Sequence, residues 1–267
     1  MVIGPPERSH STGLDLKLTL SSNVVDMTNT TQRSKPLALV TGASRGLGRA
    51  LARGLADNGW GLILDARTPT DLAAVAADLG EAVVAAIPGD VADPEHRADL
   101  NKAVAGQGGL DLLVANASNL GPSPQPALAD YPLDELRQVY EVNVLAPLAL
   151  AQLLIPALAA RNGTIVNITS DASVEPYEGW GGYGSSKAAL DQLTAILGAE
   201  HPGLRVYAVD PGDMRTQMHQ DAFPGEDISD RPEPETVVPA VLQLLHTGPK
   251  SGRYRASDFS TQPTVTA

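Results

Sequence analysis

The sequence contains no cysteine, which excludes disulfide bonds, zinc sites built on thiolates and thiol nucleophiles. Basic residues are also few, because 19 lysines and arginines stand against 31 aspartates and glutamates, for a formal net charge of −12. A chain this acidic repels nucleic acid and anionic membranes, so neither is expected as a partner. We expect no metal site. The absence of cysteine is also compatible with a cytoplasmic protein.

Long hydrophobic runs are missing as well, since no apolar run reaches the roughly 18 residues that span a membrane. The first 35 residues are rich in Ser, Thr and Asn and lack the basic and apolar regions of a signal peptide. We expect residues 1–35 to form a disordered extension. Met27 lies nine residues before the periodic sequence and is a candidate for the natural start, so residues 1–26 need not belong to the natural protein.

After this extension, short apolar strands alternate with amphipathic helical segments. Leu47, Leu51 and Leu55, for example, form one helical stripe. Such alternation predicts a doubly wound parallel α/β sheet, Rossmann-like, in a single domain over residues 36–267. Pro147 and Pro156 are expected to kink the longest helix. The predicted strands are 37–41, 62–65, 82–87, 110–115, 164–169, 205–209 and 252–256, and the predicted helices are 46–58, 70–79, 94–105, 132–160, 183–197 and 235–245.

A glycine-rich turn follows the first predicted strand, with the sequence TGASRGLG at 41–48. Glycines let the backbone turn tightly and approach a pyrophosphate, and the helix that follows offers unpaired N–H groups. The spacing is G-x-x-x-G-x-G rather than G-x-G-x-x-G, but its place between a strand and a helix indicates a dinucleotide site. The alternative is a purely structural turn. The candidate residues are Gly42, Ser44, Arg45, Gly46, Leu47 and Gly48.

The second predicted strand ends in Asp65, Ala66 and Arg67. An acidic side chain at the ribose selects NAD, whereas arginine accommodates the 2′-phosphate of NADP. Counted from Gly59, the usual NAD-selecting position is Ala66, and Arg67 follows it. Because Arg45 lies in the glycine turn as well, we expect NADP(H) as the cofactor. The alternative is that Arg67 is a solvated surface residue and Asp65 holds the ribose.

The next two predicted strands also end in polar residues. Asp90 and Val91 follow the third strand, and Asn116 and Ala117 follow the fourth. Each pair alone is merely a turn or cap sequence. At successive strand ends they fit a carboxylate that contacts adenine and an asparagine that steadies the end of the sheet.

Candidate catalytic residues follow the fifth strand. Ser170 ends that strand, Tyr183 comes 13 residues later, and Lys187 is four residues beyond Tyr183. Residues four apart share one helix face, so the ammonium can lie beside the phenol. A nearby cation favours the phenolate and is expected to lower the pKa of Tyr183 toward working pH. The alternative is a packing tyrosine and a solvated lysine.

Six motifs in order resemble the main single-domain branch of the short-chain dehydrogenase/reductase family over about residues 36–256. They are TGASRGLG at 41–48, NAS at 116–118, NVLAP at 143–147, IVNITS at 165–170, YGSSK at 183–187 and DPGDMRT at 210–216.

This resemblance implies a catalytic tetrad of Asn143, Ser170, Tyr183 and Lys187. Tyr183 would donate or accept the proton, and Ser170 would orient the carbonyl. Lys187 would bind the nicotinamide ribose, and Asn143 would hold a water in a proton relay. The resemblance also assigns the loop that holds the nicotinamide amide to Pro211, Gly212 and Thr216.

The sequence departs from the family pattern in three places. Ser118 replaces a usual glycine, and we expect little effect. A small substrate lid, at about 213–234, is shorter than is common. The SGRYRASDF end lacks the usual apolar strand, which puts a tetramer in doubt and leaves a homodimer through helices 132–160 and 183–197 as the expectation.

We therefore expect an NADP(H)-dependent carbonyl reductase or alcohol dehydrogenase acting on a small molecule. The alternatives are an NADP(H)-binding regulatory protein and an enzyme of other chemistry, such as imine reduction. The loop between Ser170 and Tyr183 is either a polar loop or a substrate wall, and a wall would favour a neutral or cationic substrate with an aromatic or cyclic body. The candidate substrate contacts are Ser118, Tyr177, Trp180, Asp213 and Met214.

Overall fold

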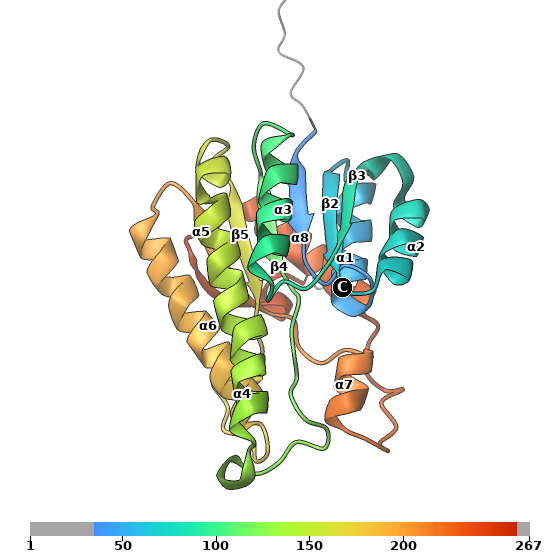
Figure 1. Cartoon of the computed structure of the whole chain (residues 1–267), viewed down its shortest axis with the longest axis vertical. Coiled ribbons are helices and arrows are strands. Elements are labelled where there is room, and N and C mark those ends of the chain that lie inside the picture. The colour runs from blue at the N-terminus through green and yellow to red at the C-terminus, as the bar shows by residue number, and fades with distance from the viewer. Residues whose placement is uncertain (1–34, 261–267) are drawn as a thin grey trace, which may run out of the picture. The chain divides into compact units, whose positions relative to one another are not determined.

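Seven parallel strands form one sheet in the order β3-β2-β1-β4-β5-β6-β7 in the computed structural model, which describes residues 35–260. This order confirms the predicted doubly wound α/β fold (Figure 1). The expectations for residues 1–34 lie outside the described residues. The strands are β1 (Leu37–Val40), β2 (Gly61–Ala66), β3 (Val83–Pro88), β4 (Leu112–Ala115), β5 (Thr164–Ile168), β6 (Arg205–Asp210) and β7 (Gly252–Arg255).

Helices cover both faces of the sheet because alternate strand residues point to opposite sides. Ala38 and Val40 pack with α1, α2 and α8, whereas Leu37 and Leu39 pack with α3, α5 and α6. Each fully buried leucine of this kind contributes about 1.5–3 kcal/mol to stability. The helices are α1 (Gly46–Asp57), α2 (Pro69–Leu79), α3 (Pro94–Ala105), α4 (Leu133–Tyr140), α5 (Ala146–Ala159), α6 (Gly181–Glu200), α7 (Gln217–Ala222) and α8 (Val238–Thr247).

The predicted long helix is continuous from α4 to α5 through a π-helical segment, Glu141–Leu145, just before Pro147. By length and composition alone, the helix Leu133–Ala159 is long and apolar enough to cross a membrane, although polar residues such as Asn143 and Gln152 interrupt its apolar run. Leu150 and Leu154 of α5 are buried in the core. Packing against the sheet therefore accounts for much of its apolar character.

The largest difference from the predicted elements is α7, which lies within the predicted lid. Its six residues are too few to show a helical period in the sequence. The Oγ1 of Thr216 caps this helix by accepting a hydrogen bond from the amide of His219 at 3.2 Å. The other differences are in element bounds, as α6 extends beyond 183–197 at both ends and α8 begins at Val238 after a short 3₁₀ turn.

The strand order reverses between β1 and β4, which are neighbours in the sheet although β2 and β3 separate them in sequence. From β1 the chain adds strands toward β3 on one side of this point, and from β4 it adds strands toward β7 on the other side. Because no helix crosses between the two strands at their carboxyl ends, a crevice opens there. This is the place where the polar strand-end residues gather.

Candidate active site

A cleft of about 840 Å³ opens at the carboxyl ends of the strands. It is lined by most of the candidate residues, but Gly48, Asn143 and Tyr177 do not line it. The candidates that do line it are Gly42, Ser44, Arg45, Gly46, Leu47, Arg67, Asp90, Val91, Asn116, Ala117, Ser118, Ser170, Trp180, Tyr183, Lys187, Pro211, Gly212, Asp213, Met214 and Thr216.

The glycine turn forms one wall of the cleft. Gly42 and Gly46 have positive φ angles of 64° and 52°, a conformation that other residues rarely adopt. Helix α1 begins here with no side-chain cap and no acidic residue in its first turn. Its free amides therefore face the cleft as a place for an anionic group. Gly48 lies behind the turn, where a Cβ would meet the carbonyl oxygen of Gly42 at 2.2 Å.

Replacing Gly48 with alanine is expected to lower the free energy of unfolding by about 1–3 kcal/mol, although alanine has the higher helix propensity. The added methyl meets backbone, so the first turn of α1 must move. Thermal unfolding measures the change. The matched control is Gly203→Ala, since a Cβ at Gly203 meets no atom within 4 Å. Equal melting temperatures for the two variants would contradict the close packing of the turn.

Asn116 and Thr41 join the ends of β4 and β1 beneath the cleft. The Asn116 Nδ2 donates to the carbonyl oxygen of Thr41 at 2.9 Å, and the Oγ1 of Thr41 accepts from the amides of Asn116 and Ala117 at 3.0 Å. These bonds hold the strand ends at the switch point in register. Asn116 thus has the position at the sheet end that the sequence suggested.

Asp65 is buried beneath the glycine turn rather than free to bind a ribose. Its Oδ1 lies 2.6 Å from the Nε2 of His96, and the amide of Gly42 also hydrogen-bonds to it. Burial raises the pKa of Asp65, although the bond with His96 opposes this, and the hydrogen bond to Asp65 raises the pKa of His96. Hydrogen bonds from the protein already engage the carboxylate of Asp65. This weakens the alternative that Asp65 binds the ribose and selects NAD.

Three exposed arginines line the cleft near the ends of β1 and β2. They are Arg45, Arg49 and Arg67, and none of them forms an ion pair within residues 35–260. Asp90 and Val91 lie at the same end, where the Val91 carbonyl accepts a 2.6 Å hydrogen bond from Arg97. Sequence reasoning missed Arg49, although its spacing of four residues from Arg45 on α1 was a usable signal.

Tyr183 and Lys187 lie together at the other end of the cleft. Tyr183 is 8% exposed and Lys187 is 2% exposed. The Lys187 Nζ is 5.4 Å from the centroid of the Tyr183 ring and donates to the carbonyl oxygen of Ile168 at 2.9 Å. The predicted packing of ammonium beside phenol is thus present in the geometry.

The direction of the Tyr183 pKa differs from the expectation. Burial raises the pKa of Tyr183 to about 12, and the charges of Asp171 and Asp210 add to this, while a hydrogen bond with Ser118 opposes it. Burial likewise lowers the pKa of Lys187 to about 8, against the opposing charge of Asp191. Desolvation by burial is the largest effect on both groups, so the phenol is protonated at neutral pH.

Asn143 is fully buried in the π-helical segment. Its Oδ1 accepts hydrogen bonds from the Ser118 hydroxyl at 3.1 Å and the Asn119 amide at 2.7 Å. Its Nδ2 donates to the Asn119 carbonyl and to the Ser186 hydroxyl. Protein groups therefore engage the side chain on every side. Ser118, for which we expected little effect, links Asn143 to the phenol of Tyr183.

Ser170 begins the short turn after β5. Its hydroxyl donates to the Asp171 Oδ1 at 3.0 Å and accepts from the Ala172 amide at 3.2 Å. At the end of the adjacent strand β6, the amide of Gly212 donates to the Asp210 Oδ1 at 3.1 Å, which fixes the loop after β6. The Ser170 turn and this loop flank the cleft beside Tyr183.

An aromatic cluster covers the Tyr183 end. The Trp180 ring lies 5.8 Å from the rings of both Tyr183 and Phe223, and Phe223 packs on His219 at 4.9 Å. Tyr177, predicted as a substrate contact, is instead 46% exposed and donates to the Asp171 Oδ2 at 2.8 Å. Met214, Met218 and Ala222 continue the apolar lining.

Comparison with known proteins identifies the family. Residues 36–227 match the short chain dehydrogenase family. The benzil reductase ((S)-benzoin forming) of Bacillus subtilis is 30% identical over 84% of this chain and 99% of its own length. The chain belongs to the short-chain dehydrogenase/reductase family.

Solved structures agree with this assignment. An oxidoreductase from E. coli superposes with a TM-score of 0.76 at 30% identity, covering 83% of this chain and 94% of the other. An alcohol dehydrogenase from the archaeon Thermococcus sibiricus, complexed with 5-hydroxy-NADP, has a TM-score of 0.75 at 30% identity, with coverage of 83% and 95%.

Proposed function

We propose that this protein is an NADP(H)-dependent oxidoreductase that interconverts a carbonyl compound and its alcohol, with Tyr183 as the acid–base group. The observation that carries the proposal is the burial of Tyr183 and Lys187 side by side in a cleft that also presents Ser170. The glycine turn suits a dinucleotide, since Gly42 and Gly46 leave the backbone open to a pyrophosphate and α1 offers free amides.

Bound in this cleft, NADPH would supply a hydride to the carbonyl carbon. The phenol of Tyr183 donates a proton to the carbonyl oxygen, so that hydride and proton together convert a carbonyl to an alcohol. The hydroxyl of Ser170 orients that oxygen. The Lys187 ammonium stabilises the phenolate left behind, and Ser118 holds the phenol in place. Because Tyr183 is protonated at neutral pH, it can donate the proton that carbonyl reduction requires.

The arginines support NADP(H) over NAD(H), and a solved relative is complexed with an NADP derivative. NADPH is expected to bind at least about tenfold more tightly than NADH. The reason is that Arg45, Arg49 and Arg67 face the end of the cleft where a 2′-phosphate would lie. Arg67→Ala is expected to reduce the difference between the two affinities, mainly by weakening the binding of NADPH. Fluorescence titration of both cofactors at fixed salt measures the affinities.

The control for this change is Arg137→Ala, which removes an exposed arginine outside the cleft. That variant should leave both affinities unchanged. Equal affinities of the wild-type protein for NADPH and NADH would refute the arginine interpretation.

The aromatic and methionine lining supports a neutral substrate with an aromatic or cyclic body, whereas Asp171 and Asp213 beside it disfavour an anion. A relative named benzil reductase points the same way. The test is NADPH consumption with acetophenone and with 4-acetylbenzoate, which differ by one carboxylate. Faster turnover of the neutral ketone is expected. No turnover with any member of a broad carbonyl panel would refute the function.

We also propose that the enzyme works in the cytoplasm as a homodimer. The outer faces of α5 and α6 expose Leu153 and Ile196, and Leu145 is exposed at the π-helical segment. These apolar side chains suit a contact between two copies of the chain. Sedimentation analysis tests the assembly.

A further inference from the structure

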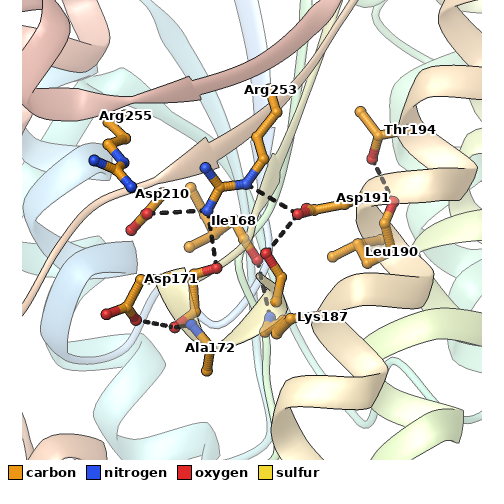
Figure 2. A network of polar contacts seen from close by, with 12 residues as sticks. Ile168, Asp171, Ala172, Lys187, Leu190, Asp191, Thr194, Asp210, Arg253 and Arg255 are labelled. Atoms are coloured by element: carbon orange, nitrogen blue, oxygen red, sulfur yellow. Dashed lines mark hydrogen bonds and ion pairs between the residues drawn. The ribbon is translucent and has the colours of Figure 1, made fainter. Parts of the chain in front are cut away.

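Arg253 of β7 contacts three separate segments: the turn after β5, the end of β6 and helix α6. Its Nη2 donates to the carbonyl oxygen of Ser170 at 3.0 Å and to the Asp210 Oδ2 at 3.0 Å. Its Nε donates to the Asp191 Oδ2 at 3.0 Å. Figure 2 shows the guanidinium lying between Asp210 and Asp191, above the turn that follows Ile168.

The same turn is held from the side of α6. The Lys187 Nζ donates to the carbonyl of Ile168, and one helical turn later Asp191 accepts a 2.6 Å hydrogen bond from the Ser173 hydroxyl. The Oδ2 of Asp191 therefore accepts hydrogen bonds from both Ser173 and Arg253. The backbone on both sides of the Ser170 hydroxyl is thus anchored to α6 and β7.

The charges in this network depend on the guanidinium. The side chains of Asp191 and Asp210 are only 15% and 6% exposed, and Arg253 pairs with both. Asp210 also accepts a hydrogen bond from the amide of Gly212, so Asp210 links the guanidinium to the loop after β6. Without it, these two nearly buried carboxylates would lose the cation that pairs with both, which is costly.

We infer that Arg253 is a positioning residue, which fixes the turn carrying Ser170 and the loop carrying Gly212 relative to Tyr183 and Lys187. The expected effect of Arg253 on turnover rests on the proposed function, whereas its expected effect on the position of the Ser170 turn does not. A planar guanidinium suits the task because it donates in several fixed directions at once, as the single ammonium of a lysine does not.

The test uses Arg253→Met, which keeps an apolar stem and removes the fork of donors. We expect kcat to fall by about tenfold to a hundredfold while KM and the Kd of NADPH stay within a few-fold, because misplacement of the reacting groups costs turnover. Amide hydrogen exchange in residues 170–174 is expected to quicken. Arg253→Lys, which restores charge but not the fork, should leave kcat well below the wild-type value.

The matched control is Arg137→Met, which removes the same charge from an exposed side chain outside the cleft. It should keep wild-type kcat and wild-type exchange. Turnover and exchange of Arg253→Met equal to those of this control would overturn the inference, as would full recovery of kcat in Arg253→Lys. If the wild type reduces no carbonyl, the proposed function fails, and the exchange of residues 170–174 alone decides the role of Arg253.

Discussion

Tyr183→Phe is expected to lower kcat for carbonyl reduction by about 10²–10⁴-fold, the range that positioned proton transfer contributes. The substitution keeps the ring, which packs in the aromatic cluster with Trp180, and removes only the hydroxyl. The Kd of NADPH should therefore stay close to the wild-type value. Steady-state kinetics and cofactor titration on the same preparations measure both quantities.

The control makes the same chemical change at Tyr131, whose hydroxyl is buried without a hydrogen-bond partner in residues 35–260 and lies outside the cleft. Tyr131→Phe should keep nearly full turnover. If Tyr183→Phe retained more than about a tenth of wild-type kcat with chemistry rate-limiting, Tyr183 would not be the principal acid–base group.

Lys187→Met is expected to make the protein more stable at neutral pH while removing most of its turnover. Burial holds the pKa of Lys187 at about 8, against 10.5 for a free lysine. The folded state therefore disfavours the charged form, and stability is lost as pH falls from about 10.5 to about 8. This shift corresponds to about 3 kcal/mol at pH 7, less about 1 kcal/mol for the Ile168 carbonyl that the variant leaves without its donor.

The pH dependence of stability tests the effect of burial on Lys187. The stability advantage of Lys187→Met over the wild type should shrink by about 2 kcal/mol between pH 7 and pH 10, because the wild-type lysine becomes neutral. Denaturant unfolding at both pH values measures it. Lys102→Met, at a lysine side chain that is 76% exposed, should show no comparable trend. If the stability difference between variant and wild type stayed constant with pH, burial would not hold the pKa of Lys187 near 8.

The parts of the molecule that could be predicted from sequence are those governed by local pattern. Alternating strands and helices gave the fold class, and the glycines of 41–48 lie in the turn where the sequence placed them. The spacing of Tyr183 and Lys187 is a helix property, so their proximity could be expected. Ser170 belongs to the same group, because strand ends meet at one edge of the sheet.

The parts that escaped prediction depend on contacts between distant segments. His96 meets Asp65 across 31 positions, and Arg253 meets Ser170 across 83. No local period records such pairs. The Tyr183 pKa was predicted in the wrong direction because spacing shows the neighbouring lysine but not the depth of burial, and burial is the larger effect.

The position of Arg253 in the chain has a consequence for biosynthesis. Ser170, Lys187 and Asp191 are all translated before β7, and Asp210 precedes Arg253 by 43 positions. A nascent chain can therefore pair β1 to β6 and form the glycine turn while the guanidinium is still missing from the Ser170 turn. The turn that carries Ser170 would then be fixed only once β7 has been synthesised.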